Sequence, residues 1–409
     1  MNMKRLQAAL LTALLLMTPI GSLADAESRL TALRSLCDTL EQNHYQIYEL
    51  TDEADWAARK EEAAHLAQTL DDGAYAYALV ELAASLHDAH TQAGLTPEAQ
   101  TDMRVLPVQG YWFDDGLRLL AAPEEQAQLV GGTLLAIDGT PIETVYERFS
   151  ALLSYDNEAY RRKQFAQSFM NADALSYLDL IESTDGATLT VRDEAGNDAV
   201  VRLDTVSFAQ MQSIHFAAVQ RAATPVAEQA RALYQTAELS QNALLISYYG
   251  CQEDPNLTMD AFAQQVKAQI EAGSYDRVLV DLRYNGGGDS SVIDPLLKVL
   301  GEQRQSRHFK LITLIGENTF SSALMNAVQL RQIGAELVGR PTGGSVNHYG
   351  ELGYAELEGL PLVLYYSTKH FVMDASYGAG SLLPDTEVPF LYADYIAGRD
   401  ADVEAALTL

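Results

Sequence analysis

The stretch that decides the fold is residues 277–322, RVLVDLRYNGGGDSSVIDPLLKVLGEQRQSRHFKLITLIGENTFSS. Its first apolar run leads into three glycines at 286–288, and a second apolar run at 311–315 leads to Ser321 and Ser322 at the predicted start of a helix. Glycines let backbone N–H groups approach a ligand closely, and a helix start presents unpaired N–H donors. A serine hydroxyl facing such a loop has the parts of a nucleophile beside an oxyanion hole. This stretch therefore indicates an enzyme.

Strands and helices alternate from residue 242 to the end of the chain. Each expected strand is a short apolar run, and each expected helix has apolar residues at helical spacing. The alternation predicts an α/β domain at 242–409 with a mainly parallel sheet covered by helices. The strands are expected at 243–248, 278–282, 311–315, 337–338 and 362–366, and the helices at 259–272, 292–301 and 322–333.

The first half divides into a helical and a β-rich part. Leucines at helical spacing and a break at 71–73 predict a helical segment at 25–95. Short β-like runs with Asp-Gly turns follow at 96–210, and 211–241 is expected to be a helical connector. The run at 129–142, LVGGTLLAIDGTPI, resembles the central part of a PDZ domain, which implies capture of extended peptide ends. An ordinary small β module is the alternative.

The N-terminus has the pattern of a secretory signal at 1–24. Lys4 and Arg5 precede an apolar run at 6–17, and small residues at 22–24 offer a cleavage site. A membrane anchor is the alternative, but Pro19 interrupts the run before the roughly 20 residues that a span needs. We expect a secreted or extracytoplasmic protein, attached to a membrane only through an uncleaved leader.

The chain is strongly acidic, with a net charge of −29. Such a surface repels nucleic acid and anionic membranes, so neither is an expected partner. The two cysteines, Cys37 and Cys251, are equally compatible with a disulfide and with two buried thiols.

Three blocks resemble the catalytic domain of the C-terminal processing peptidases, or tail-specific proteases, and the related core of tricorn protease. They are DLRYNGGG at 281–288, NTFSSA at 318–323 and GRPTGG at 339–344. With DAHT at 88–91 and the PDZ-like run, the resemblance spans most of the chain. It implies a crotonase/ClpP-like α/β catalytic domain, a PDZ-like module, an N-terminal helical segment and a serine peptidase without a cofactor.

The resemblance assigns roles to particular residues. Ser321 would be the nucleophile, and the backbone N–H groups of Gly287 and Ser322 would hold the oxyanion, with Gly286 beside them. The alternatives are that Ser321 only caps a helix, which serine does well, and that the glycines only form a tight turn.

The general base departs from the family pattern. Ser345 stands where the processing peptidases have a lysine, so a serine–lysine pair is not expected. The tricorn core uses a histidine in a block that resembles 88–91, which makes His90 the expected base; an imidazole suits this role at neutral pH. The alternative is that His90 only ends a helix. The tricorn-type acid is missing, and the residue orienting the imidazole stays open among Asp88, Asn347, His348 and Glu351, with His348 also the second choice of base.

These observations predict an exported serine peptidase that hydrolyses extended or unfolded polypeptides. No metal is expected because His87 and His90 lack companion ligands at the usual spacings, and residues 286–288 lack the continuation of a phosphate-binding loop. One alternative is a non-catalytic peptide-binding relative that kept the fold but lost the base. A second is an acyl-thioester enzyme of the crotonase type, which export argues against.

Overall fold

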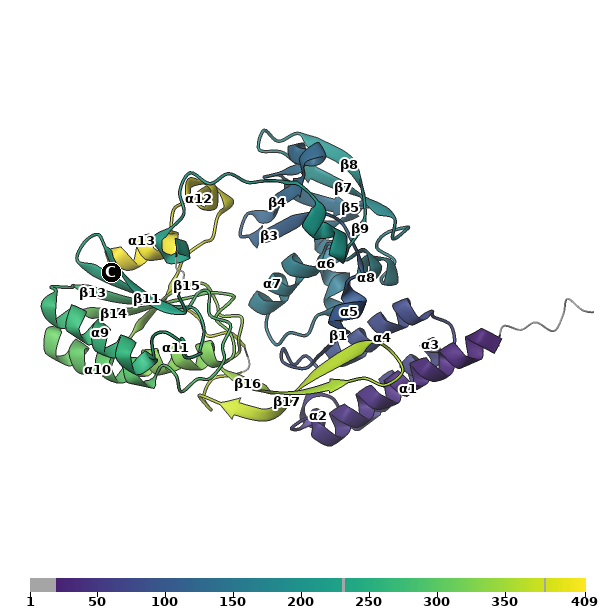
Figure 1. The fold of residues 1–409 in the computed structure, drawn as a ribbon, viewed down its shortest axis with the longest axis horizontal. Helices are drawn as coiled ribbons and strands as arrows, with labels where there is room; N and C mark the ends of the chain where they lie inside the picture. Colours follow the sequence, from purple (N-terminus) through teal and green to yellow (C-terminus); the bar gives the residue numbers. More distant parts are fainter. Residues whose placement is uncertain (1–19, 230–231, 379) are drawn as a thin grey trace, which may run out of the picture.

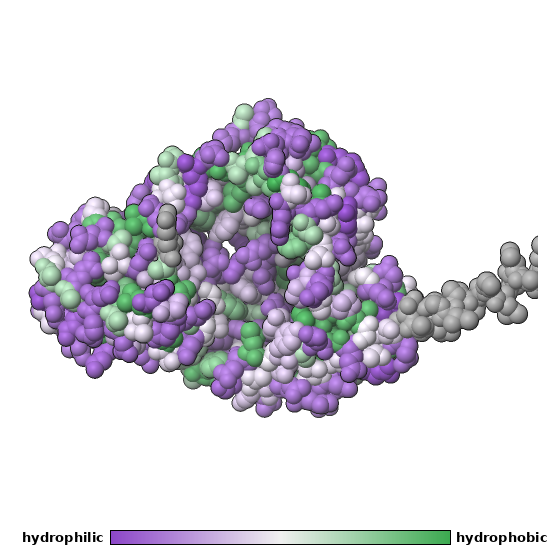
Figure 2. All heavy atoms as spheres, viewed as in Figure 1, coloured by the Kyte–Doolittle hydropathy of each residue, from purple (hydrophilic) through white to green (hydrophobic). Residues whose placement is uncertain are grey.

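The computed structural model describes residues 20–229, 232–378 and 380–409, and three parts of the chain surround a common hollow (Figures 1 and 2). A helical part and a β-rich part come from the first half, and an α/β part comes from the second. Most of the expected signal, residues 1–19, lies outside the described residues, and helix α1 begins at Ile20. Of the helices described, none is both long and apolar enough to cross a membrane.

The helical part contains α1 (Ile20–Asn43), α2 (Ile47–Leu50), α3 (Glu53–Leu66) and α4 (Asp72–Ala84). The side chains of Asp52 and Asp71 accept hydrogen bonds from backbone N–H groups at the starts of α3 and α4, which explains why the helices begin there. The expected break at 71–73 is therefore confirmed. The core of the helical part includes Leu36, Leu40, Trp56, Tyr75 and Leu79.

A hairpin from the second half completes this helical part. Strand β17 (Leu362–Val372) pairs antiparallel with β16 (Asn347–Glu356) on one side and with β1 (Gln92–Leu95) on the other. Leu362 and Leu364 of β17 are buried in the same core as the helices. Figure 1 shows the hairpin running from the α/β part to the helices. The two halves of the chain thus share one sheet directly after the His90 loop.

The β-rich part is a seven-stranded sheet whose main path is β10-β4-β5-β7-β8, with β3 and β6 at its side. The sheet and three helices enclose an apolar core, to which the helices contribute Val145, Phe149, Phe165 and Leu175. Its strands are β3 (Gln109–Phe113), β4 (Gly116–Pro123), β5 (Thr133–Ile137), β6 (Thr140–Pro141), β7 (Gly186–Arg192), β8 (Asp198–Asp204) and β10 (Phe216–Ala218), and its helices are α6 (Ile142–Phe149), α7 (Glu158–Ser168) and α8 (Ala172–Tyr177). Short elements α5 (Pro97–Gln100), β2 (Arg104–Val105) and β9 (Val206–Ser207) lie nearby.

The α/β part has a six-stranded sheet in the order β11-β12-β13-β14-β15-β18. All neighbours from β12 onward are parallel, and every residue of β12 is buried, as expected for a sheet covered on both faces. The predicted alternation is confirmed as far as β15, but the strand expected at 362–366 is wrongly placed, because it lies in β17 and pairs antiparallel with β1 and β16 outside this sheet. The strands are β11 (Tyr234–Leu239), β12 (Ala243–Tyr248), β13 (Arg277–Asp281), β14 (Lys310–Ile315), β15 (Glu336–Gly339) and β18 (Thr386–Glu387); the helices are α9 (Met259–Ala272), α10 (Asp294–Arg307), α11 (Ser322–Gln332), α12 (Tyr392–Ala397) and α13 (Ala401–Thr408).

The expectation of a helical connector at 211–241 is wrong. In the described residues this segment contains strands β10 and β11, with short 3₁₀ turns at Phe208–Ser213 and Val226–Gln229. Pro225 disfavours a helix around it because it has no backbone N–H to donate. The backbone groups of β10 and β11 form hydrogen bonds with β4 and β12 instead. Long-range strand pairing therefore overrides the local pattern.

Candidate active site

Ser321 lies directly before helix α11, at the end of the loop that follows β14. Its backbone has φ +52° and ψ −127°, a region that side-chain-bearing residues adopt only at a cost of about 1–3 kcal/mol. Its side chain makes no capping hydrogen bond to the helix. The alternative that Ser321 serves only as a helix cap is therefore wrong, and its hydroxyl is left for another purpose.

The glycine loop after β13 lies against the start of this helix. Gly287 has φ +109°, and a Cβ atom on it would lie 2.8 Å from the Cβ of Ser321 and 3.1 Å from the backbone N of Ser322. No other residue type fits there without moving the nucleophile. Both the conformation and the close approach explain the glycine.

The backbone N–H groups of the site differ in whether they are engaged. The Gly287 N–H donates to Asn285 Oδ1 at 2.9 Å, so the amide expected to hold an oxyanion already has a partner. The amides of Gly286, Gly288 and Ser322 donate to no other residue in the described part of the chain. Since Gly286, Gly288 and Ser322 also line the cavity beside Ser321, the free donors belong to these residues.

His90 faces the same cavity, which has a volume of about 630 Å³. Its side chain is 6% exposed, and among the described residues neither ring nitrogen has a hydrogen-bond partner. Burial lowers the pKa of the His90 imidazole, and the nearby Asp88 carboxylate opposes this only in part. His90 is thus a neutral, unpartnered imidazole in a cavity with Ser321, without a direct hydrogen bond between the two side chains. The cavity is lined by His90, Gly286, Gly288, Asp289, Ser290, Phe320, Ser321, Ser322, Met325, His348, Glu351, Leu352 and Phe371.

Asp88 holds the His90 loop but does not bind the imidazole. Its carboxylate accepts hydrogen bonds from the backbone N of His90, from Thr91 Oγ1 and from His44 Nε2. Ser367 Oγ of β17 donates to it at 2.6 Å. Burial would raise the pKa of Asp88, but these hydrogen bonds outweigh burial and lower it. Asp88, one of the four candidates left open for orienting the ring, does not do so, because its oxygens bind the loop, His44 and Ser367 instead.

His348 also lines the cavity, and a backbone carbonyl fixes its orientation. Its Nδ1 lies 2.9 Å from the carbonyl oxygen of Ser345, and because a carbonyl only accepts, Nδ1 carries the proton. Burial, followed by the proximity of His90, lowers the pKa of His348 to about 4. The imidazole is therefore neutral near pH 7.

Ser345, in the position of the family's lysine, contacts the β-rich part. Asn157 Nδ2 donates to the Gly343 carbonyl at 2.8 Å and to Ser345 Oγ at 3.2 Å. Burial is the main cause that raises the pKa of the neighbouring Asp156 to about 7. The turn that carries His348 is thus fastened to a different part of the molecule, which no local sequence pattern indicated.

Two other expected supporting residues have structural partners. Asn347 donates through Nδ2 to the carbonyls of Asp374 and Tyr377, at 2.8 and 2.7 Å, and so holds a neighbouring loop. The interpretation of Asn347 as a ring-orienting residue is wrong for this reason. Glu351 lines the cavity, but its carboxylate forms an ion pair with Lys369 at 2.8 Å.

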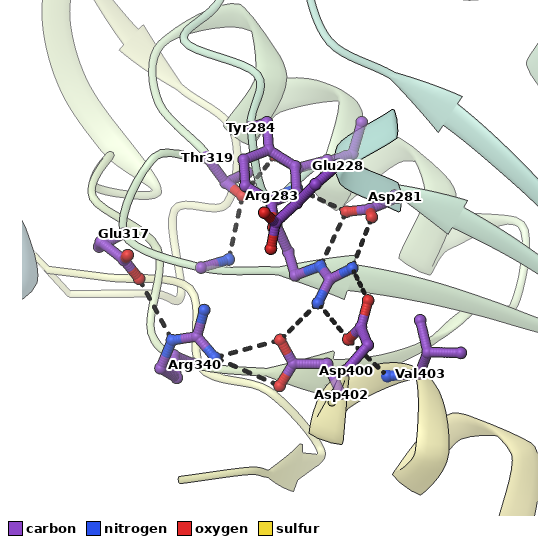
Figure 3. Close-up of polar contacts among 12 residues, drawn as sticks. Glu228, Asp281, Arg283, Tyr284, Glu317, Thr319, Arg340, Asp400, Asp402 and Val403 are labelled. Carbon is purple, nitrogen blue, oxygen red and sulfur yellow. Dashed lines mark hydrogen bonds and ion pairs between the residues drawn. The ribbon is translucent and has the colours of Figure 1, made fainter. Parts of the chain in front are cut away.

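A buried ionic network, shown in Figure 3, includes Asp281 and Arg283, which precede the glycine loop in the sequence. The Arg283 guanidinium binds Asp281, the last residue of β13, at 2.7 Å. It also binds Asp400 and Asp402 at the start of α13, at 2.7 and 2.9 Å. The end of the chain is thereby attached to the residues that precede the glycines.

The network continues to the nucleophile loop and the β-rich part. Arg340 binds Asp402 at 3.1 Å and Glu317 at 3.2 Å, and the hydroxyl of Tyr111 on β3 donates to Glu317 (Figure 3 shows the arginine contacts). No local sequence pattern indicates this network, because Arg283, Glu317, Arg340 and the aspartates of α13 lie far apart in the chain.

Both cysteines are buried, free thiols. Of the two possibilities left open by the sequence, the structure has two separate thiols. Cys251 Sγ lies 3.3 Å from Asn326 Oδ1, and burial raises its pKa to about 11.

Comparison with known proteins gives a result at the level of the fold. No family model matches the sequence, and no curated protein matches it. The structure of mature CPAF complexed with lactacystin aligns with a TM-score of 0.65 and 14% identity, over 93% of this chain and 97% of that one. A second structure of mature CPAF gives a TM-score of 0.62 at 14% identity, over 93% and 96%. The chain therefore has the fold of mature CPAF over nearly its whole length.

Proposed function

We propose that this chain is a serine peptidase that hydrolyses extended or unfolded polypeptides. One observation carries the proposal: the strained Ser321, whose hydroxyl caps nothing, shares a cavity with a buried histidine whose ring nitrogens have no hydrogen-bond partner among the described residues. Backbone strain and unsatisfied buried groups both cost stability and concentrate at functional sites. The fold of mature CPAF supports the same conclusion.

In the proposed mechanism Ser321 Oγ attacks the substrate carbonyl while His90 takes the hydroxyl proton. The oxyanion is held by the Ser322 amide and an amide of the glycine loop, where Gly286 and Gly288 have the free donors in this conformation. One such donor contributes roughly 3–4 kcal/mol to the transition state. His90 then protonates the leaving amine, and water hydrolyses the acyl-enzyme with His90 again as base. Hydrogen bonds between nucleophile and base commonly tighten only when substrate binds.

The β-rich part would guide the substrate as a PDZ-like module. Strand β3 pairs with β4 on one side only, and helix α7 lies beside it. A cavity of about 510 Å³ lies there, against the α/β part, and its walls include Gly110, Trp112 and Lys163. An extended peptide end adding to an edge strand would suit this position. Export through the N-terminal signal belongs to the same proposal.

The test is the Ser321→Ala variant, assayed on an unfolded polypeptide and with a fluorophosphonate probe. We expect the variant to lose both hydrolysis and covalent labelling. Ser290→Ala is the matched control, because Ser290 lines the same cavity and should leave labelling intact. Hydrolysis by Ser321→Ala at the wild-type rate would remove Ser321 from the mechanism.

A second function, peptide binding without catalysis, is favoured by one observation. In the described residues the His90 ring forms no hydrogen bond with Ser321 Oγ, and no carboxylate binds the ring and orients it. Under this alternative the wild type binds an unfolded polypeptide but neither cleaves it nor reacts with the probe.

A further inference from the structure

Four aromatic rings follow one another through the active site. Tyr160 and Phe320 have ring centroids 4.4 Å apart and planes inclined by 10°. Phe320 and His90 are 4.6 Å apart at 22°, and His90 and His348 are 5.5 Å apart at 18°. No ring contact joins Tyr160 to His90, or Phe320 to His348, in the part of the chain that the structure describes. The rings therefore form one stack in the order Tyr160, Phe320, His90, His348.

The stack collects its rings from separate parts of the molecule. Tyr160 lies on α7 of the β-rich part, and Phe320 directly precedes Ser321. His90 comes from the loop after α4, and His348 lies on β16. The base is thus held between the segment that carries the nucleophile and the hairpin that carries His348.

Stacking is the one specific contact that the His90 ring makes. Its nitrogens have no partner among the described residues, and Asp88 is bound to the backbone and not to the ring. In a Ser-His-Asp triad a carboxylate holds the imidazole in the productive orientation. Here the faces of Phe320 and His348 fix the plane of the ring and leave its nitrogens free for proton transfer.

We propose that Phe320 and His348 are positioning residues for His90, and that this stack replaces the hydrogen-bonded acid of a triad. The proposal rests on the proposed function, in which His90 is the base. It extends to Tyr160, which supports Phe320 from the far side.

The chemistry of the two neighbours suits this role. A phenyl face attracts a cation, so Phe320 stabilises the imidazolium that forms when His90 accepts the serine proton. His348 donates its Nδ1–H to the Ser345 carbonyl, which holds its ring in place as an uncharged neighbour. Aromatic pairs contribute on the order of 1 kcal/mol beyond burial, so losing one should reduce kcat about three- to tenfold.

The experiment compares Phe320→Leu, which removes the ring, with Phe320→Tyr, which keeps it. We expect Phe320→Leu to lower kcat about three- to tenfold with little change in KM, and Phe320→Tyr to retain activity. Phe208→Leu is the matched control, since Phe208 is exposed and far along the chain from the site. Equal kcat values for wild type and Phe320→Leu would overturn the proposal.

His348 is tested by two variants of opposite design. His348→Phe keeps an aromatic face but cannot take a proton, whereas His348→Ala has no ring. A positioning role predicts that His348→Phe keeps most of the activity and His348→Ala loses about three- to tenfold. Loss of activity in both would show that the aromatic face of His348 is not sufficient and would overturn its role in the stack.

A spectroscopic readout separates this inference from the proposed function. In ¹H–¹³C NMR the Hε1 resonance of His90, assigned with a His90→Gln variant, should be displaced upfield by the ring current of Phe320. The displacement should persist in Phe320→Tyr and become smaller in Phe320→Leu, where only the His348 ring remains stacked on His90. If the wild type shows the displacement without hydrolysis or probe labelling, the stack exists and the proposed function fails. If hydrolysis occurs and the displacement is absent, the stack fails alone.

Discussion

Ser367 Oγ donates to Asp88 Oδ2 at 2.6 Å, although the two residues are 279 positions apart in the sequence. The bond joins strand β17 of the second half to the loop that carries His90. The backbone N–H of Ser367 also donates to Thr91 Oγ1 of this loop, at 3.2 Å. The position of the proposed base His90 is therefore set by a strand, β17, that lies far from it in the sequence.

Replacing Asp88 by Asn should loosen the base loop. An amide offers one acceptor oxygen where the carboxylate receives four donors, so buried donors lose partners at a cost of about 1–3 kcal/mol. We expect lower stability in chemical denaturation together with a fall in kcat. Asp38→Asn, an exposed aspartate on α1, is the control and should change neither. Unchanged stability in Asp88→Asn would show that the hydrogen bonds to Asp88 do not hold the His90 loop.

Acid should destabilise the protein partly through His348. Its pKa in the folded state is about 4, below the unfolded value, so the unfolded chain binds a proton first as pH falls. The contribution of the neutral His348 to the free energy of unfolding is fully present above about pH 6.5. It is lost between there and about pH 4, by on the order of 3 kcal/mol. The free energy of unfolding measured across this range should depend less steeply on pH in His348→Phe. An equal slope in both proteins would show that His348 does not titrate in this way.

The acid limb of the activity profile should lie below the ordinary histidine range. Burial lowers the pKa of His90, so the base stays unprotonated to lower pH than a free imidazole does. A plot of kcat/KM against pH should accordingly fall only below about pH 6.5. A fall that begins above this value would exclude a buried, neutral His90 as the base.

Gly287→Ala should disable the site more than it destabilises the fold. The added Cβ would meet Ser321 Cβ at 2.8 Å, and φ +109° strains any residue with a side chain. We expect about a hundredfold loss of kcat, comparable with losing an oxyanion donor. Gly301→Ala is the control, because a Cβ there meets nothing within 4 Å and lies in helix α10. Gly301→Ala should raise stability by about 0.5–1 kcal/mol and leave kcat unchanged.

Removing the charge of Arg283 should cost far more than removing a surface arginine. Arg283→Met would leave Asp281, Asp400 and Asp402 buried without this partner, at a cost of about 3–5 kcal/mol. Arg399→Met breaks exposed pairs and should cost less than about 1 kcal/mol in the same denaturant titration. Burial alone would raise the pKa of Asp400, but Arg283 outweighs burial and lowers it. The difference in free energy of unfolding between wild type and Arg283→Met should therefore become smaller below about pH 4, where the carboxylates take up protons. A constant gap would argue against a charge effect.

The sequence predicted the parts of the fold that local patterns determine. Apolar runs such as 311–315 are bounded by turns and alternate with amphipathic segments, so the four central strands β12 to β15 could be placed, whereas the edge strands β11 and β18 could not. Ser321 and the glycine loop could be identified because their chemistry depends on adjacent residues. The close approach of Gly287 to Ser321 agrees with that identification.

The remainder depends on contacts between distant residues. Nothing near Tyr160 in the sequence indicates a partner at Phe320, and Asp402 gives no sign of binding both Arg283 and Arg340. The connector was misjudged for the same reason, because β10 and β11 form only against strands elsewhere in the chain. The identity of the groups around His90 likewise required the pairing of β1 with β17.

The hairpin β16–β17 and helix α13 have a consequence for biosynthesis. The His90 loop leaves the ribosome early, but the strand that fixes it ends at Val372 and the helix that anchors Arg283 ends at Thr408. A nascent chain therefore has no assembled site until it has been synthesised as far as helix α13. Under the proposed function, the order of synthesis itself keeps the growing polypeptide from hydrolysing its neighbours.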